Sequence, residues 1–255
     1  MGERLKILDL CSGIGGFTLG FEAVGFRTIA FCEIEPYCRG VLEKHWPGIP
    51  IYEDIKQLSA DRLRADGIVP DIICGGYPCQ PFSVAGYRRG KEDDRHLWPF
   101  IIPLVAGLRP AWCVFENVYG HISMGIDDVL DDLESENYAT RTFVLGALAV
   151  DAKHRRDRVW IIARNVADTS IERCQRSSTT PIHGFRDLSP QFEGSDSNVQ
   201  DGWPPEPGVG RVADGISNRA HRTKGLGNAI VPQIVTQIGK IINECEQHHS
   251  RKRHR

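Results

Sequence analysis

The sequence predicts an α/β protein built on a mostly parallel sheet with helices on both faces. Short apolar runs alternate with amphipathic segments over the first 165 residues, and a glycine-rich turn, "CSGIGG", follows the first apolar run. Strand–helix alternation is typical of parallel sheets, in which both faces are covered and ligands bind at the carboxyl ends of the strands. A chain of 255 residues is long enough for one substantial hydrophobic core.

Each expected element follows from its own pattern. Buried strands are expected where the apolar runs lie, at residues 5–10, 28–33, 70–76, 111–117 and 158–163. The segments between them have helical spacing or charge patterning, which predicts helices at residues 16–25, 36–46, 58–66, 96–107 and 126–136. A final helix is expected near the C-terminus, because one of its faces would be apolar: Ile230, Ile234, Ile238, Ile241 and Ile242.

Composition limits the classes of function. The apolar fraction of 41% and the charged fraction of 25% are those of ordinary globular proteins, and the net charge of −2 gives no general argument for nucleic-acid binding. No apolar run approaches the ~20 residues that a membrane span needs, and the N-terminus does not resemble a signal peptide, so we expect a cytoplasmic protein. The eight cysteines form no C-x-x-C pair, and neither a disulfide framework nor a metal site is expected.

The chain changes character after the last expected strand. Residues 166–210 are rich in Ser, Thr, Pro, Gly, Asp and Arg and show no sustained period, which is typical of a flexible insertion. Order returns before the final helix. Residues 246–255 are strongly basic, and we expect them to form a solvated, disordered tail.

A nucleoside site is predicted around the glycine-rich turn. Gly13, Gly15 and Gly16 would let the backbone turn tightly and approach a ligand, where the first helix offers free N–H groups. Such a turn alone is weak evidence, because it also serves close packing. Carboxylates at strand ends strengthen it, since they suit ribose hydroxyls and an adenine amino group and would repel a pyrophosphate. The acidic strand ends are Asp9, Glu33 and Asp54.

A second site is predicted around Cys79, in the stretch "GGYPCQPFS". Prolines on both sides exclude a helix interior or a central strand. A single loop cysteine is most often structural. Here, however, Glu116 ends another strand of the same sheet, and the arginines of "HRRDR" precede the last strand. A thiolate needs cationic neighbours to lower its pKa, so this arrangement favours a nucleophilic cysteine.

Five blocks in a fixed order now resemble one known family. The blocks "DLCSGIGG", "GGYPCQPFS", "FENV", "HRRDRVWII" and "HRTKGLGNAIVPQ" are similar to those of the DNA (cytosine-5)-methyltransferases over residues 5–164 and 211–245. The resemblance implies a Rossmann-like fold that uses S-adenosyl-L-methionine and methylates carbon 5 of cytosine in duplex DNA. It implies a catalytic domain over residues 1–165 and 211–245, and a short target-recognition segment over 166–210.

The resemblance also implies roles for individual residues. Cys79 would add to carbon 6 of a flipped cytosine, Glu116 would protonate or hydrogen-bond ring nitrogen 3, and Arg158 would contact the carbonyl oxygen. The cofactor would be bound by Asp9, Gly13, Gly15, Gly16, Phe17, Glu33, Asp54, Ile55, Pro78 and Asn228, with Pro232 shaping the same pocket. The substrate would be bound by Gln80, Ser83, Arg95, Asn117 and Arg156, although Arg95 could instead form a surface ion pair with Asp93 or Asp94.

The chain departs from the family pattern in three places. Cys11 stands where the family usually carries Phe, so an aromatic stack on adenine is missing or supplied elsewhere. His154 stands where Gln is commonest. The recognition segment is short, and its basic residues could meet phosphates or base edges: Arg173, Arg176, His183 and Arg186.

Two alternatives to a DNA methyltransferase are open. One is an RNA cytosine-5 methyltransferase, because a thiol adds to carbon 6 equally well in RNA. The other is a non-catalytic DNA-binding relative, against which the intact Cys79 and Glu116 argue. One chain carries every block, so we expect a monomer. A restriction endonuclease could be a functional rather than a physical partner.

Overall fold

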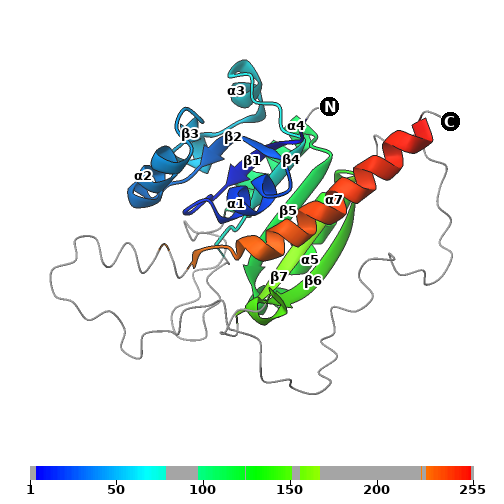
Figure 1. Cartoon of the computed structure of the whole chain (residues 1–255). Coiled ribbons are helices and arrows are strands. Elements are labelled where there is room, and N and C mark those ends of the chain that lie inside the picture. The colour runs from blue at the N-terminus through cyan, green and yellow to red at the C-terminus, as the bar shows by residue number, and fades with distance from the viewer. Residues whose placement is uncertain are drawn as a thin grey trace, which may run out of the picture.

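The computed structural model describes residues 4–78, 97–123, 125–150, 156–166, 225 and 228–253, with the helical backbone alone for 249–253. A seven-stranded sheet has the order β3-β2-β1-β4-β5-β7-β6 (Figure 1). The strands are β1 (Lys6–Leu10), β2 (Arg27–Cys32), β3 (Ile51–Tyr52), β4 (Ile72–Gly75), β5 (Trp112–Val118), β6 (Tyr138–Gly146) and β7 (Asp157–Asn165). The helices are α1 (Gly16–Glu22), α2 (Pro36–His45), α3 (Ala60–Ala65), α4 (Trp98–Leu108), α5 (Ile126–Ser135) and α7 (Pro232–Arg253), with 3-10 turns η1 (Ile55–Gln57), η2 (Tyr119–Ser123) and η3 (Ala147–Val150).

Strand direction reverses at one end of the sheet. The strands from β3 to β5 pair in parallel, whereas β7 runs antiparallel to both β5 and β6. The first residues of β7 therefore lie at the carboxyl edge of the parallel strands, where Val118 is paired with Arg158. The sheet is mostly parallel, which confirms the predicted α/β class.

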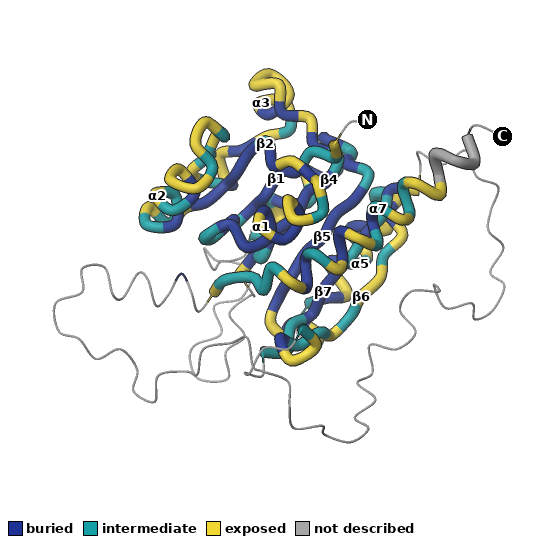
Figure 2. Tube along the Cα trace, in the orientation of Figure 1, coloured by how far each residue is buried: buried dark blue, intermediate teal, exposed yellow. Residues whose placement is uncertain are grey.

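Helices cover both faces of the sheet. α3, α4 and α5 bury residues such as Leu63, Ile101 and Leu133 against one face. α1 and α7 bury Phe21 and Ile238 against the other. Figure 2 shows the central strands buried, whereas the outer surfaces of the helices are exposed. This burial on both faces explains why the central strands read as continuous apolar runs.

The five expected strands and the helices between them are present, and two strands were not expected. β6 is an edge strand whose sequence "YATRTFVLG" mixes polar and apolar residues, and only Tyr138 in it is buried. β3 has two residues, too few to produce a recognisable pattern. Both lie at the margins of the sheet, where burial imposes the weakest constraint on sequence.

The structure differs from the expected disordered tail as far as Arg253. α7 continues through it from Pro232, where a disordered end was expected from residue 246. The Trp112 indole donates a hydrogen bond to Glu246 at 3.0 Å, which holds this part of the helix against β5. Basic residues near a helix C-terminus also suit the helix dipole. No helix in the described part of the chain is both long and apolar enough to cross a bilayer.

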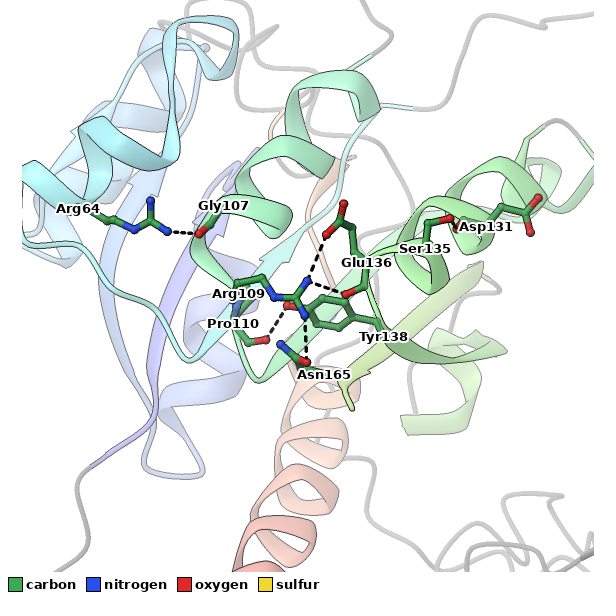
Figure 3. Close-up of polar contacts among 9 residues, drawn as sticks. All are labelled: Arg64, Gly107, Arg109, Pro110, Asp131, Ser135, Glu136, Tyr138 and Asn165. Atoms are coloured by element: carbon green, nitrogen blue, oxygen red, sulfur yellow. Dashed lines mark hydrogen bonds and ion pairs between the residues drawn. The ribbon is translucent and has the colours of Figure 1, made fainter. Parts of the chain in front are cut away.

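A polar cluster closes the amino edge of the sheet, opposite the predicted sites (Figure 3). Arg109 ends α4 with a φ of 53°, and its guanidinium donates to the Glu136 carbonyl at 2.6 Å and to Asn165 at 3.3 Å. The Tyr138 hydroxyl donates to the Pro110 carbonyl at 2.7 Å. These contacts join the start of β5 to the end of β7.

Alanine substitutions at two helical glycines are expected to change the free energy of unfolding in opposite directions, because only one of them lies where α1 packs on α7. A Cβ on buried Gly20 would overlap the Pro232 carbonyl and lie 2.5 Å from the Val235 Cβ. Gly20→Ala is therefore expected to destabilise the fold by about 1–3 kcal/mol. Gly40→Ala, on exposed α2 with no described atom within 4 Å, is expected to stabilise it by about 0.5–1 kcal/mol. Urea unfolding of both variants measures this, and equal effects would contradict the packing.

Candidate active site

A carboxylate from the neighbouring strand holds the glycine-rich turn. Gly13 and Gly15 adopt φ angles of 54° and 86°, which residues with a side chain rarely adopt. One oxygen of Glu33 accepts a hydrogen bond from the Gly13 amide at 2.7 Å, and the other accepts one from the Glu35 amide at 2.8 Å. Glu33 thus ties the turn to the end of β2. Each carboxylate oxygen has a further lone pair for a ligand.

Two of the three glycines approach the protein itself. A Cβ on Gly15 would lie 2.5 Å from the Trp46 ring, and one on Gly16 would lie 2.8 Å from the Ile230 carbonyl oxygen. A Cβ on Gly13 would meet no described atom within 4 Å. The turn therefore leaves room for a ligand beside Gly13, whereas the other two glycines permit close packing.

Asp9 and Phe17, both expected among the cofactor contacts, have buried side chains. An Asp9 oxygen accepts a hydrogen bond from Thr18 at 2.8 Å, and Thr28 donates to Thr18 at 3.0 Å. Burial raises the pKa of Asp9 to about 8. Phe17 packs edge-on against Trp160 with ring centroids 5.8 Å apart. These side chains support the turn from inside the protein, and their expected part in cofactor binding stays a prediction.

Asp54 lies near the strand end that carries Glu33. The Glu33 amide donates to the Tyr52 carbonyl at 2.9 Å, so the chain after β2 runs beside the chain after β3. Asp54 caps η1 by accepting from the Lys56 amide at 2.9 Å, and Ile55 is buried beside it. The two carboxylates form an acceptor set that fits the hydroxyl and amino groups of a nucleoside.

An ion pair forms the second half of the candidate site. Arg158, at the start of β7, places its Nε 2.9 Å from a carboxylate oxygen of Glu116 near the end of β5. Glu116 is 8% exposed. Burial raises the pKa of Glu116 to about 7, although the positive charges of Arg158 and Arg156 act in the opposite direction. At neutral pH this carboxyl group can therefore both hold and release a proton.

Asn117 contacts the protein instead of facing outward. It is 3% exposed, its amide nitrogen donates to the Tyr77 carbonyl at 3.1 Å, and its amide oxygen accepts from the Val118 amide at 2.8 Å. The expected contact of Asn117 with a substrate stays a prediction. The side chain holds the backbone immediately before Pro78, which is exposed.

The segment before α7 joins the two halves. The Arg156 guanidinium donates to the Ala229 carbonyl at 3.0 Å. Asn228 is exposed, as expected for a residue that could contact a ligand. Ile230 lies against both Gly16 and Gly76, since a Cβ on Gly76 would be 3.0 Å from its Cδ1.

Several predicted residues lie outside the described part of the chain. They are Cys79, Gln80, Ser83, Arg95, His154, Arg173, Arg176, His183 and Arg186. Cys11 is described: it is half-buried, with a φ of 50°.

Residues that the sequence did not single out complete the site. Thr18 holds Asp9, and His121 bonds the Tyr77 hydroxyl with 3.0 Å between the oxygen and Nε2. Ile230 was expected only as part of an apolar helix face. A signal existed for His121, because an imidazole five residues after Glu116 follows the end of a predicted strand. Nothing in the sequence pattern indicated that Ile230 would touch two glycines so far from it along the chain.

The chain is similar in sequence to proteins named Type II methyltransferases. The chain is 32% identical over 172 residues to the Type II methyltransferase M.AplI of Arthrospira platensis, covering 65% of this chain and 47% of that protein. It is 32% identical over 166 residues to the Type II methyltransferase M.HgiBI of Herpetosiphon aurantiacus, covering 63% of this chain and 37% of that protein. The chain thus spans less than half the length of these two curated relatives.

Solved structures share the fold. A DNMT2 variant of Spodoptera frugiperda matches with a TM-score of 0.57 at 24% identity, covering 69% of this chain and 54% of that one. The Dnmt2 methyltransferase of S. pombe matches with a TM-score of 0.56 at 21% identity, covering 71% of this chain and 58% of that one. The family model for C-5 cytosine-specific DNA methylases matches residues 5–199. The chain therefore belongs to the C-5 cytosine-specific DNA methylase family.

Proposed function

We propose that this chain transfers a methyl group from S-adenosyl-L-methionine to carbon 5 of cytosine in duplex DNA. The observation that carries the proposal is the buried Glu116–Arg158 pair, with a pKa of about 7 for Glu116. It lies at the same edge of the sheet as the Glu33-held turn. Membership of the family supports the reaction type.

The proposed cofactor site consists of Glu33, Asp54 and the space beside Gly13. Glu33 would accept hydrogen bonds from the ribose hydroxyls, and Asp54 would accept one from the adenine amino group. Ile55, Pro78 and Asn228 would flank the nucleoside. When bound, S-adenosyl-L-methionine supplies an electrophilic methyl group.

The proposed reaction begins when the Cys79 thiolate forms a bond to carbon 6 of a flipped cytosine. The electron pair of the 5,6 double bond then reaches carbon 5, while Glu116 gives its proton to ring nitrogen 3. Arg158 contacts the carbonyl oxygen and stabilises the charge on the ring. Carbon 5 would then take the methyl group as the sulfur–methyl bond of the sulfonium breaks and S-adenosyl-L-homocysteine leaves. The carbon 5 proton would pass to solvent water. The sulfur–carbon bond breaks, nitrogen 3 returns its proton, and the double bond is restored.

Other parts of the functional account also stay predictions. Gln80, Ser83 and Arg95 would contact the substrate, and residues 166–210 would read the target sequence. A monomeric state and a restriction endonuclease as functional partner also stay predictions; the names of the relatives, Type II methyltransferases, suggest only a restriction-modification context.

The central test is methyl transfer by the purified protein with labelled S-adenosyl-L-methionine. Bisulfite sequencing of DNA from cells that express the chain would first identify the target sequence. A duplex with 5-fluorocytosine at that target is then expected to trap a covalent complex stable to denaturation. The fluorine replaces the carbon 5 proton, whose loss is needed to release the cysteine. Cys79→Ser should give neither transfer nor complex, whereas Cys245→Ser, at a half-buried cysteine of α7, should give both. Methylation of RNA but not of DNA would identify an RNA methyltransferase.

Cofactor binding is expected to depend on Glu33. In Glu33→Gln, one acceptor oxygen becomes an NH₂ group that cannot accept from the Gly13 or Glu35 amide. In the proposed site the same change removes the charge from the hydrogen bond to a ribose hydroxyl, a bond worth about 1.5–3 kcal/mol, so affinity should fall about 10- to 100-fold by calorimetry. The control is Glu53→Gln, whose exposed carboxylate pairs with Arg39 at 3.4 Å. Equal affinities for both variants would exclude the proposed site.

Glu116 is also expected to change how stability depends on pH. Its folded-state pKa, about 7, lies above the ordinary value of 4.5, so the folded protein keeps a proton that the unfolded chain releases. This contribution to stability is complete below pH 4.5 and is lost as the pH rises through 7. Urea unfolding from pH 4.5 to 8 should show the wild type losing stability relative to Glu116→Gln. A difference that does not change with pH would contradict the raised pKa.

A further inference from the structure

Tyr77 is held at both its backbone and its side chain by the segment that carries Glu116. Its carbonyl accepts a hydrogen bond from Asn117 at 3.1 Å, and its hydroxyl lies 3.0 Å from Nε2 of His121. Both rings are buried, with exposures of 5% for Tyr77 and 3% for His121. Burial lowers the pKa of His121, which favours its neutral form, and the ring tautomer decides whether Nε2 accepts from or donates to the Tyr77 hydroxyl.

The residues on either side of the 79–96 segment meet in the same cluster. The Tyr77 ring lies 5.5 Å from the Trp98 ring and 6.0 Å from the Phe115 ring, measured between centroids. Trp98 begins α4, and its indole donates to Asp132 of α5 at 2.8 Å. Tyr77 and Trp98 are therefore in contact although they are far apart along the chain.

Packing alone does not require polar side chains at these two buried positions. Phenylalanine and leucine would fill comparable space, and a buried hydroxyl or imidazole destabilises a fold unless it is hydrogen-bonded. The Tyr77–His121 bond adds direction to the contact. Tyr77 is two residues before Cys79 and His121 is five residues after Glu116, so the bond relates the two proposed reacting groups through short lengths of chain.

We propose that the Tyr77–His121 hydrogen bond is a positioning contact that sets the backbone leading to Cys79 relative to Glu116. The inference rests on the proposed function, in which Cys79 attacks the base that Glu116 binds. Attack requires near-ideal placement of the reacting atoms, and a misplacement of about 1 Å can cost about 100-fold in rate. Tyr77 and His121 touch neither the base nor the cofactor in this proposal.

The test compares Tyr77→Phe with Tyr138→Phe. Each variant removes one buried tyrosine hydroxyl, but Tyr138 bonds the Pro110 carbonyl at the opposite edge of the sheet (Figure 3). Tyr77→Phe is expected to lower kcat and the rate of covalent complex formation with 5-fluorocytosine DNA by about 10- to 100-fold. The KM for S-adenosyl-L-methionine should stay within twofold. Tyr138→Phe should lower the melting temperature comparably and leave kcat within twofold.

A double variant separates positioning from stability. Tyr77→Phe/His121→Leu removes the hydroxyl and the imidazole together, so neither group stays buried after losing the other. Its melting temperature should therefore exceed that of either single variant, while kcat stays low. Recovery of kcat together with stability would overturn the inference, as would a Tyr77→Phe enzyme with the wild-type kcat. Absence of a covalent complex with the wild type would instead overturn the proposed function.

Discussion

The reversal of strand direction between β5 and β7 is the constraint on which the candidate site depends. Because β7 runs antiparallel, its first residues lie at the carboxyl edge, and Arg158 reaches Glu116 at 2.9 Å. A parallel β7 over the same residues would place Arg158 near the other edge, opposite Trp112 and roughly 13 Å along the sheet from Glu116. Glu116 would then be a buried acid without its cation. The reversal therefore determines whether this carboxyl group can ionise near neutral pH.

The two halves of the site share one wall. Ile230 lies against Gly16 of the glycine-rich turn, and it also lies against Gly76, which is close to Glu116. A Cβ on Gly76 would also lie 3.4 Å from a Glu116 oxygen. The start of α7 is fixed there by the bond between Arg156 and the Ala229 carbonyl. A segment from the far end of the chain thus lies against both the glycine-rich turn and the wall beside the Glu116–Arg158 ion pair.

Much of the fold could be predicted because burial leaves a pattern. β1, β4 and β5 are covered on both faces and read as apolar runs, whereas the edge strand β6 does not. Glu33 and Glu116 could be predicted because each is an acid directly after an apolar run. Strand direction has no such signature, so the pairing of Glu116 with Arg158 could not be derived from periodicity.

The contacts that the sequence could not predict join distant parts of the chain. Asp9 and Phe17 are in a motif that suggests ligand binding, yet Thr18 and Trp160 hold them inside the protein. Asn117, which was expected to bind substrate, donates a hydrogen bond to the Tyr77 carbonyl. In each case the partner is brought close by the fold, and the residue's own neighbours in sequence do not specify which way its side chain points.

The most direct test is an NMR titration of the Glu116 carboxyl carbon in protein labelled at glutamate, with Glu116→Gln used to assign the signal. We predict a midpoint near pH 7, as burial beside Arg158 requires, and a higher midpoint in Arg158→Met, because the arginine favours the charged form. A midpoint near the ordinary value of 4.5, or one that Arg158→Met does not move, would contradict the claim that the reversed strand places these two groups together in a buried site.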